Sequence, residues 1–289
     1  RTGKVVGEVK TAETTQLALA QLMVGREVTA VQSGDAPVVE KAARAPVLQV
    51  EHVHALNTRR LPALRGVQLA VQAGEIVGLA GVAGNGQTEL GEVLSGLRPP
   101  TQGRVLVNSQ DVTHADPVGM TQAGVGRIPE DRLKGVVATL TVAENMALES
   151  LDEFTKAGGQ LDQTRLRTHA QQLINDFQIK AQPFTPAGSL SGGNMQKVVV
   201  AREMSFGPRL LMAAQPTRGV DVGSIEFIHK RIVAARDAGA GVLLVSAELD
   251  EILALSDRIA VVHGGQVVAE MPAEGADRAQ IGRLMAGDH

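Results

Sequence analysis

The chain has 289 residues, of which 44% are hydrophobic, so it is long enough to form one large domain or two small ones with a full core. Its 28 basic and 31 acidic residues give a formal net charge of -3, which argues against a general nucleic-acid-binding protein. The absence of cysteine excludes disulfides, thiolate metal sites and cysteine nucleophiles. No apolar run approaches the roughly 20 residues that cross a bilayer, so any membrane association is expected to be peripheral.

The two ends of the chain resemble each other. Residues 1–27 align with residues 263–289 without a gap, and both segments predict a strand, a polar turn and a short amphipathic helix. Identical pairs are Gly3 and Gly265, Val5 and Val267, Val6 and Val268, Glu8 and Glu270, Leu22 and Leu284, Met23 and Met285, and Gly25 and Gly287. We interpret residues 1–27 as the tail of a preceding module and residues 28–46 as a linker, with chance similarity as the alternative.

Strands and helices are expected to alternate along most of the remaining chain. Short apolar runs predict buried parallel strands, and apolar residues at helical spacing predict the helices between them. Strands are expected at residues 67–71, 75–81, 104–107, 210–214, 242–246 and 259–262, and helices at 88–97, 195–204, 224–238 and 248–255. Such alternation indicates an α/β fold with a doubly wound parallel sheet, in which ligands bind at the carboxyl ends of the strands.

Residues 136–190 interrupt this alternation and are expected to be mostly helical. The apolar residues that fall on one helical face there are Leu166, Ala170, Leu173, Ile174 and Phe177. The aromatic residues expected to pack this part are Phe154, Phe177, Phe184 and Phe206. We interpret the segment as an inserted helical subdomain.

A glycine-rich loop at residues 81–88 (GVAGNGQT), here called the first glycine loop, lies between a predicted buried strand and a helix. That context, with Gly81, Gly86 and the hydroxyl of Thr88, is typical of a phosphate-binding P-loop. Gln87 replaces the lysine of the pattern, and its neutral amide cannot offset the charge of a phosphate. Losing a charge-assisted hydrogen bond costs about 1.5–3 kcal/mol, so nucleotide affinity is expected to fall. An ordinary glycine-rich turn is the alternative.

A second glycine loop, residues 190–197 (LSGGNMQK), precedes another predicted helix. Its two consecutive glycines leave backbone N–H groups free to approach a phosphate at the start of that helix. Ser191 is also a good helix cap, so an ordinary capped helix start is the alternative. The loop therefore predicts an anion site only in combination with the other motifs.

Five motifs occur in the order GVAGNGQT, RIPEDR, LSGGNMQ, LLMAAQPTRGVDVG and LLVSAELDEI. With these motifs, residues 47–289 resemble the nucleotide-binding domain of ABC transporters. The resemblance is greatest to the second of two fused ATPase domains in bacterial importers of nucleosides and simple sugars. It implies an ABC-type P-loop fold with a parallel core sheet, an antiparallel N-terminal sheet and a helical subdomain at about residues 136–190. It also implies that residues 1–27 end a preceding tandem ATPase module.

The resemblance implies ATP as the cofactor. In ABC domains each ATP lies between the P-loop of one domain and the signature loop of its partner, and the second glycine loop matches the signature. The binding residues implied are Gly81, Gly84, Asn85, Gly86, Gln87, Thr88 and Glu89 in the first glycine loop and the helix after it, Ser191, Gly192, Gly193 and Asn194 in the second, and Asp221 beyond them. Asp221 has two alternative roles, which are contact with the opposite site and capping of the helix that starts near Gly223.

Several positions that carry the family's chemistry hold other residues here. Ala214 and Gln215 replace the aspartate that holds Mg²⁺ and the glutamate that polarises water, and neither can act as a base. Glu130 replaces a glutamine, Ala247 replaces the switch histidine, and His54 is the only ring where an adenine-stacking aromatic is expected. We predict a site that holds ATP weakly or statically, without catalytic or metal-binding residues of its own, and Mg²⁺ binding is doubtful.

The predicted function is therefore that of one half of an importer ATPase whose second glycine loop completes the ATP site of the preceding module. The predicted partners are that module and transmembrane permease subunits, one helix of which would enter a groove around Glu130, with no nucleic acid. The predicted location is the cytoplasmic face of the bacterial membrane. One alternative is a fully active ATPase in which Glu130 supplies the carboxylate. The other is an ABC protein of DNA repair or translation, against which the lack of cysteine and of a basic linker argues.

Overall fold

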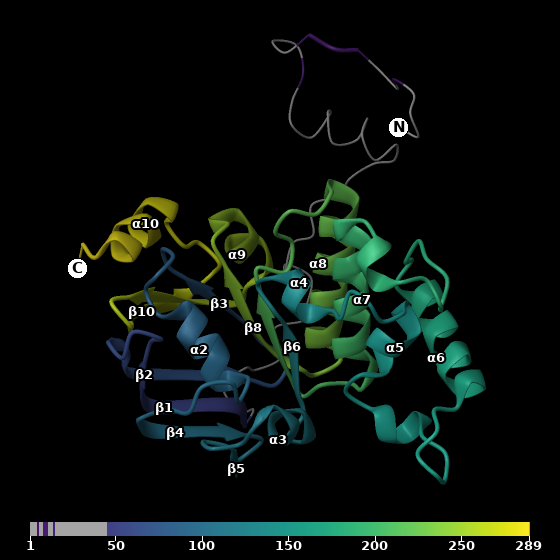
Figure 1. The fold of residues 1–289 in the computed structure, drawn as a ribbon. Helices are drawn as coiled ribbons and strands as arrows, with labels where there is room; N and C mark the ends of the chain where they lie inside the picture. The colour runs from purple at the N-terminus through teal and green to yellow at the C-terminus, as the bar shows by residue number, and fades with distance from the viewer. Residues whose placement is uncertain (1–4, 6–7, 11–13, 15–44, 289) are drawn as a thin grey trace.

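The computed structural model describes residues 5, 8–10, 14 and 45–288 (Figure 1). The tail and the linker predicted for residues 1–46 lie almost entirely outside these residues and stay predictions. Residues 45–288 form two sheets with helices packed around them, and the strands position the loops that carry the motifs.

Four strands form an antiparallel sheet with the order β2, β1, β4, β5. The strands are β1 (Pro46–Leu56), β2 (Pro62–Gln72), β4 (Gln102–Val107) and β5 (Gln110–Asp111). In β2 the buried apolar side chains Leu64, Val67, Leu69 and Val71 are separated by more exposed ones, as expected when one face of a sheet packs on the core. This is the antiparallel N-terminal sheet that the resemblance implied.

The second sheet has the order β10, β9, β3, β8, β7, β6. Its strands are β3 (Ile76–Ala80), β6 (Val125–Ile128), β7 (Leu210–Ala214), β8 (Gly241–Ser246), β9 (Arg258–His263) and β10 (Gln266–Pro272). All pairs are parallel except β10 with β9. Every residue of β3 and β8 is buried, because both faces of a parallel sheet are covered. The predicted parallel core sheet is confirmed, with one antiparallel edge strand added.

The helices cover both faces of the parallel sheet. They are α2 (Gln87–Leu94), α3 (Pro117–Gln122), α4 (Arg132–Gly135), α5 (Val142–Ala147), α6 (Gln163–Asp176), α7 (Gly192–Ser205), α8 (Val222–Asp237), α9 (Leu249–Leu255) and α10 (Arg278–Ala286), with short 3-10 helices η3 (Leu151–Phe154) and η4 (Ala187–Ser189). One apolar cluster joins α5, α6, α7 and α8 to the sheet, and a second joins α2 and the antiparallel sheet to it. Figure 1 shows α2 and α7 separated by the core strands.

The helical character predicted for residues 136–190 is confirmed by α5, α6 and the two 3-10 helices. The predicted face of α6 is buried, and so are Phe154 and Phe177. The prediction was wrong for Phe184 and Phe206, which are 48% and 37% exposed. Phe184 lies in a tight turn, and Phe206 follows the last residue of α7, so neither lies on a buried helix face.

Candidate functional site

The loops that carry the motifs meet at one edge of the parallel sheet. Strands β3, β6, β7 and β8 run in the same direction, so the segments after Ala80, Ile128, Ala214 and Ser246 all leave the sheet at its carboxyl edge. These segments contain the first glycine loop, the Glu130 region, the Gln215 region and Ala247. The topology therefore brings four of the five sequence motifs to one edge.

The first glycine loop has the backbone form of a phosphate-binding loop. Gly84 and Gly86 have φ angles of 91° and 105°, which L-residues with side chains rarely adopt. Gly86 immediately precedes α2, so the N–H groups of the first turn of α2 face the loop. The Asn85 side-chain oxygen accepts a hydrogen bond from the N–H of Gly264 at 3.0 Å, which fixes the loop to the turn between β9 and β10. Thr88 is exposed and Glu89 half-buried in that first turn.

The side chain of Gln87 folds back into the same loop. Its Nε2 donates a hydrogen bond to the carbonyl oxygen of Val82 at 3.2 Å. A Cβ atom added to Gly81 would collide with the same Nε2, so the amide lies directly against the first glycine of the loop. The Gln87 amide thus lies against the backbone of the loop, where it can offer a hydrogen bond but no charge.

The second glycine loop starts α7, but not through the cap expected from sequence. Ser191 is the N-cap residue, yet its side chain makes no capping hydrogen bond and instead accepts one from Asn194 Nδ2 at 2.9 Å. Asn194 Oδ1 in turn accepts from the N–H of Lys180 at 2.9 Å, which fixes the loop to the segment after α6. The N–H groups at the start of α7 are therefore not satisfied by the serine side chain, as an anion site requires.

Asp221 lies beside the second glycine loop and also caps α8. It accepts hydrogen bonds from the N–H of Ser224 at 3.0 Å and from its hydroxyl at 2.7 Å. Burial alone would raise the pKa of Asp221, but these hydrogen bonds outweigh burial and lower it. A Cβ at Gly193 would stand 2.7 Å from Asp221 Oδ2 and from Ser224 Oγ, so a larger residue there would have to displace these side chains. The capping role of Asp221 is present in the structure, and its contact with an opposite site stays a prediction.

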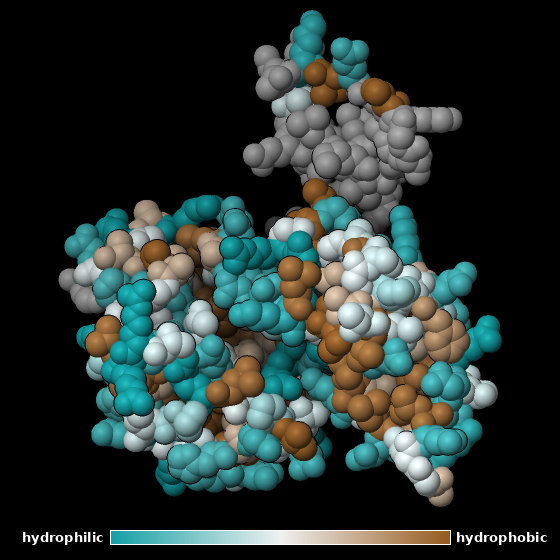
Figure 2. Space-filling view, viewed as in Figure 1, coloured by the Kyte–Doolittle hydropathy of each residue, from teal (hydrophilic) through white to brown (hydrophobic). Residues whose placement is uncertain are grey.

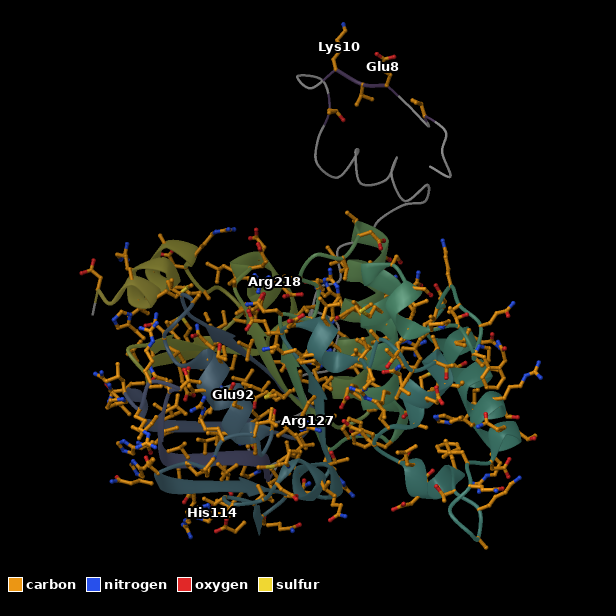
Figure 3. The ribbon with its side chains drawn as sticks, viewed as in Figure 1. Glu8, Lys10, Glu92, His114, Arg127 and Arg218 are labelled. Carbon is orange, nitrogen blue, oxygen red and sulfur yellow. The ribbon has the colours of Figure 1, made fainter. Side chains whose placement is uncertain are left out.

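Residues 215–221, here called the interface loop, contain contacts that the sequence did not indicate. Arg218, which Figure 3 labels, forms an ion pair through Nη1 with Glu130 Oε1 at 2.7 Å, although 88 positions separate the two residues. Arg132 Nη1 donates to the carbonyl oxygen of Arg218 at 2.8 Å. Both arginines belong to motifs used for the resemblance, but spacing alone cannot assign them a partner.

The two glycine loops do not meet within the chain. The first loop contacts the β2 start and the turn between β9 and β10, whereas the second contacts the segment after α6, the interface loop and Arg132. Gln215 has a positive φ of 48°, and its N–H donates to Val245 O at 2.7 Å, which directs the interface loop away from the end of β7. The two glycine loops therefore lie in separate surroundings within this chain.

The end of β7 carries no carboxylate. Ala214 ends β7 without an oxygen ligand, and the nearby Gln215 and Thr88 are neutral. Among the residues that the structure describes, no group of three or more histidine and acidic side chains could hold a metal ion. In the same part of the chain, no helix is long and apolar enough to cross a membrane.

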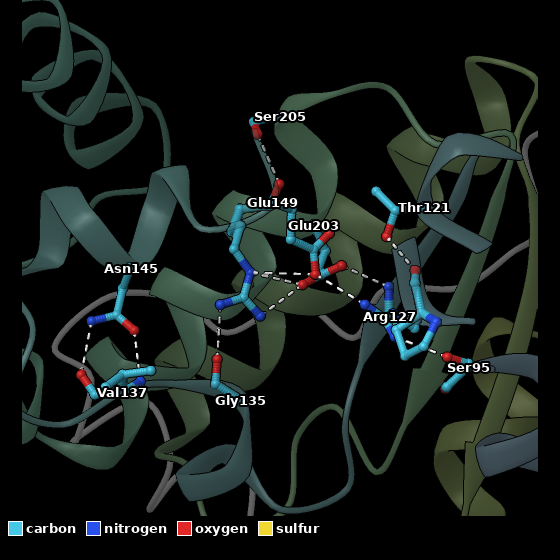
Figure 4. A network of polar contacts seen from close by, with 11 residues as sticks. Ser95, Thr121, Arg127, Gly135, Val137, Asn145, Glu149, Glu203 and Ser205 are labelled. Atoms are coloured by element: carbon cyan, nitrogen blue, oxygen red, sulfur yellow. Dashed lines mark hydrogen bonds and ion pairs between the residues drawn. The ribbon is translucent and has the colours of Figure 1, made fainter. Parts of the chain in front are cut away.

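A buried polar network joins the parallel sheet to the helical segment (Figure 4). Arg127 of β6 donates its N–H to Glu203 Oε2 at 2.8 Å and pairs with Glu149 at 3.2 Å. Arg202 pairs with Glu203 at 2.8 Å and donates to Gly135 O at 2.9 Å. Burial raises the pKa of Glu203 to about 7, although Arg202 opposes this.

Beside this network is a cavity of about 160 Å³ between α3, α5 and α7. Its lining residues include Thr121, Met146, Glu149 and Phe206. The sequence analysis predicts a groove around Glu130. Glu130 is exposed and does not line this cavity. The cavity thus lies at the junction of the sheet and the helical segment, a position that depends on tertiary packing.

Comparisons with known proteins agree on one protein family. A family model for ABC transporters matches residues 64–218. The chain is 43% identical over 293 residues to the nucleoside import ATP-binding protein NupA of Lactococcus lactis subsp. cremoris, and 44% identical over 292 residues to the glucose import ATP-binding protein TsgD13 of Haloferax volcanii. These alignments cover 99% of this chain but 56% and 52% of the two relatives, so the chain spans about half the length of the curated relatives it matches.

Solved structures show the same fold. The ATP-binding subunit of an ABC transporter has a TM-score of 0.70 at 21% identity, covering 83% of this chain and 99% of that one. A dimeric ATP-binding cassette with ADP and phosphate in a post-hydrolysis state has a TM-score of 0.67 at 23% identity, covering 79% of this chain and 100% of that one. The architecture with two sheets and helices on both faces is therefore that of an ATP-binding cassette.

Proposed function

The chain belongs to the ABC transporter family of ATP-binding domains, and from that premise we propose that it is one ATP-binding half of an importer for nucleosides or simple sugars. The relatives described above, and a guanosine import ATP-binding protein of Bacillus subtilis at 42% identity, are named for nucleoside or sugar import. This chain spans about half of each, and the other half of such a polypeptide, which we propose precedes it, would supply the second ATP-binding module.

We propose further that the two ATP sites of the complete protein differ. The observation that supports this is the contrast between the two glycine loops. The second loop has N–H groups that its serine does not cap, and Gly193 lies close against Asp221, whereas in the first loop the Gln87 amide bonds to Val82 O and Ala214 supplies no carboxylate. The second loop would cap an ATP held by the preceding module, and the site on the first loop would hold ATP weakly or statically, without Mg²⁺.

The proposed partners on the membrane side are permease subunits, which would place the protein at the cytoplasmic face of the bacterial membrane. Figure 2 shows hydrophobic surface over the part of the molecule where Figure 1 places α4 and α5. Exposed apolar side chains in this region include Leu133, Val137 and Leu151. Together with the nearby cavity beside Glu149, they would form a surface suited to an amphipathic segment of a permease.

The contacts of Glu130 weaken the alternative of a fully active site on the first glycine loop. In that alternative, Glu130 would replace the missing carboxylate near the phosphates. Its Oε1 instead pairs with Arg218 on the interface loop. The alternative functions in DNA repair or translation receive no support from the relatives, which are named for import.

Hydrolysis assays test the proposal. The purified chain should show almost no ATP hydrolysis, and the complete polypeptide with its permease should hydrolyse ATP. In that complex, Gly193→Asp should abolish hydrolysis coupled to transport, because the new carboxylate would face both Asp221 and the phosphate. Gly282→Asp on α10, where the structure leaves open space, is the matched control. Normal hydrolysis by the Gly193→Asp protein, or rapid hydrolysis by the chain alone, would refute the asymmetric site.

A further inference from the structure

Arg132, the first residue of α4, lies between two glycine positions that are far apart in the sequence. A Cβ added to Gly192 of the second glycine loop would stand 3.1 Å from Arg132 Nη2, and one added to Gly219 of the interface loop would stand 3.1 Å from Nη1. Arg132 Nη1 also donates to Arg218 O at 2.8 Å. One guanidinium group therefore lies against both the second glycine loop and the interface loop, beside the place where Gly193 meets Asp221.

The position of Arg132 is fixed from both ends of α4. Asp131 caps this short helix by accepting a hydrogen bond from the N–H of Leu133 at 3.0 Å. At the other end, Gly135 O accepts from Arg202 of α7 at 2.9 Å, so α4 is attached to α7. The ion pair between Glu130 and Arg218 adds a second connection to the interface loop. These contacts limit the movement of the guanidinium.

The positive charge of Arg132 lies beside Gly192 at the start of α7, which is an unusual place for a cation. A cation beside the N-terminus of a helix is electrostatically unfavourable, because the helix dipole is already positive there. Within residues 45–288 the guanidinium makes one hydrogen bond, to a neutral carbonyl group, and forms no ion pair. The proposed function provides the compensating charge, since the phosphate of a neighbouring module's ATP would bind at the start of α7.

We infer that Arg132 is a positioning residue of the composite ATP site. It links the second glycine loop to the interface loop and keeps their relative position fixed, and it adds positive potential where the phosphate binds. This inference rests on the proposed function. Misplacement of a binding group by about 1 Å can lower a rate about 100-fold, so this contact should affect turnover more than it affects folding.

The test uses the complete polypeptide with its permease and compares Arg132→Ala, Arg132→Lys and Lys134→Ala. Lys134 is an exposed cation on the same helix and serves as the control. We expect kcat for ATP hydrolysis to fall about 10- to 100-fold in Arg132→Ala, where kcat is referred to the molecules that bind ATP. The fall should be smaller in Arg132→Lys, which keeps the charge. Lys134→Ala should match the unchanged protein, and the midpoint of thermal unfolding should stay within about 2 °C in all variants.

The results separate the inference from the proposed function. If Gly193→Asp abolishes hydrolysis but Arg132→Ala and Arg132→Lys both behave like Lys134→Ala, the inference about Arg132 is wrong and the proposed function stands. If Gly193→Asp leaves hydrolysis intact, the proposed function is wrong and the inference fails with it. Should Arg132→Ala fail to fold, Arg132→Lys decides, because unchanged turnover in that variant would refute positioning by the guanidinium fork.

Discussion

Gln87 Nε2 donates a hydrogen bond to the carbonyl oxygen of Val82 at 3.2 Å, so a side chain of the first glycine loop bonds to the backbone of the same loop. A lysine at this place could turn toward a phosphate and neutralise part of its charge, whereas an amide has no charge to offer. A single substitution at Gln87 should therefore change the affinity of the first glycine loop for ATP.

The first prediction follows from that contact. Gln87→Lys should bind ATP about 10- to 100-fold more tightly than the unchanged chain, because a charge-assisted hydrogen bond contributes about 1.5–3 kcal/mol. Hydrolysis should stay near background, since Ala214 and Gln215 provide no carboxylate. Isothermal titration calorimetry and a phosphate-release assay measure the two effects. Gln87→Met removes the amide without adding charge and should show no gain. Equal gains in both variants would show that charge is not the cause.

The second prediction separates the two roles of Asp221. Asp221→Ala should lower the free energy of unfolding by about 1 kcal/mol through loss of the α8 cap, whereas Asp221→Asn should be nearly neutral because it keeps an acceptor oxygen. Urea titration measures this difference. If Asp221 also contacts the opposite ATP site, Asp221→Asn should reduce hydrolysis by the complete polypeptide while leaving stability unchanged. Full ATP hydrolysis by the Asp221→Asn protein would mean that Asp221 acts only as the cap of α8.

Protonation of Asp221 should also affect stability at acid pH. Its pKa in the folded chain is lowered from the ordinary value of 3.8, so the unfolded chain takes up a proton first as the pH falls. The contribution of this carboxylate is present above pH 3.8 and is lost as the pH falls through the lower pKa of the folded state. The difference in stability between the unchanged chain and Asp221→Ala should therefore narrow below that pH in urea titrations.

The third prediction concerns Asn145, which is fully buried in α5. Its Oδ1 accepts from the N–H of Val137 at 2.8 Å, and its Nδ2 donates to Val137 O and Thr141 O, both at 3.0 Å. Asn145→Leu should lower the free energy of unfolding by about 1–3 kcal/mol, because it leaves the N–H of Val137 without its partner, whereas Val137 O and Thr141 O each keep a backbone hydrogen bond. Urea titration of the chain measures the loss. A loss below about 0.5 kcal/mol would mean that water or a local shift satisfies those groups.

The fourth prediction concerns Glu203 in the network of Figure 4. Burial raises its pKa from 4.5 to about 7, so between these values the folded chain holds a proton that the unfolded chain has lost. Stability should therefore fall as the pH rises through this range, by at most about 1.4 kcal/mol per pH unit from this group. Glu203→Gln cannot titrate and should show a flatter profile between pH 5 and pH 7. Parallel profiles for the two proteins would contradict the raised pKa.

Much of the fold and of the two glycine loops could be predicted from sequence because their determinants are local. Buried parallel strands such as Leu210–Ala214 are short apolar runs, and the turns at Gly84 and Gly86 depend on the conformational freedom of glycine. The family pattern also identified the replaced groups at Gln87 and Ala214, since their positions follow from spacing within a motif. The burial of side chains that lie outside a helical repeat was harder to predict, and Phe184 and Phe206 were wrongly expected to be buried.

Only the tertiary structure decided which of these groups meet. The pair Glu130 with Arg218 joins segments that are distant in sequence, and it forms because β6 lies beside β7 with both carboxyl ends at one edge. Gly193 meets Asp221 because α7 packs against α8 with these two residues at the helix starts. The same packing places Arg132 between the second glycine loop and the interface loop. Sequence determines local backbone form through residue type and period, whereas such contacts depend on strand order and on how the helices pack against the sheet.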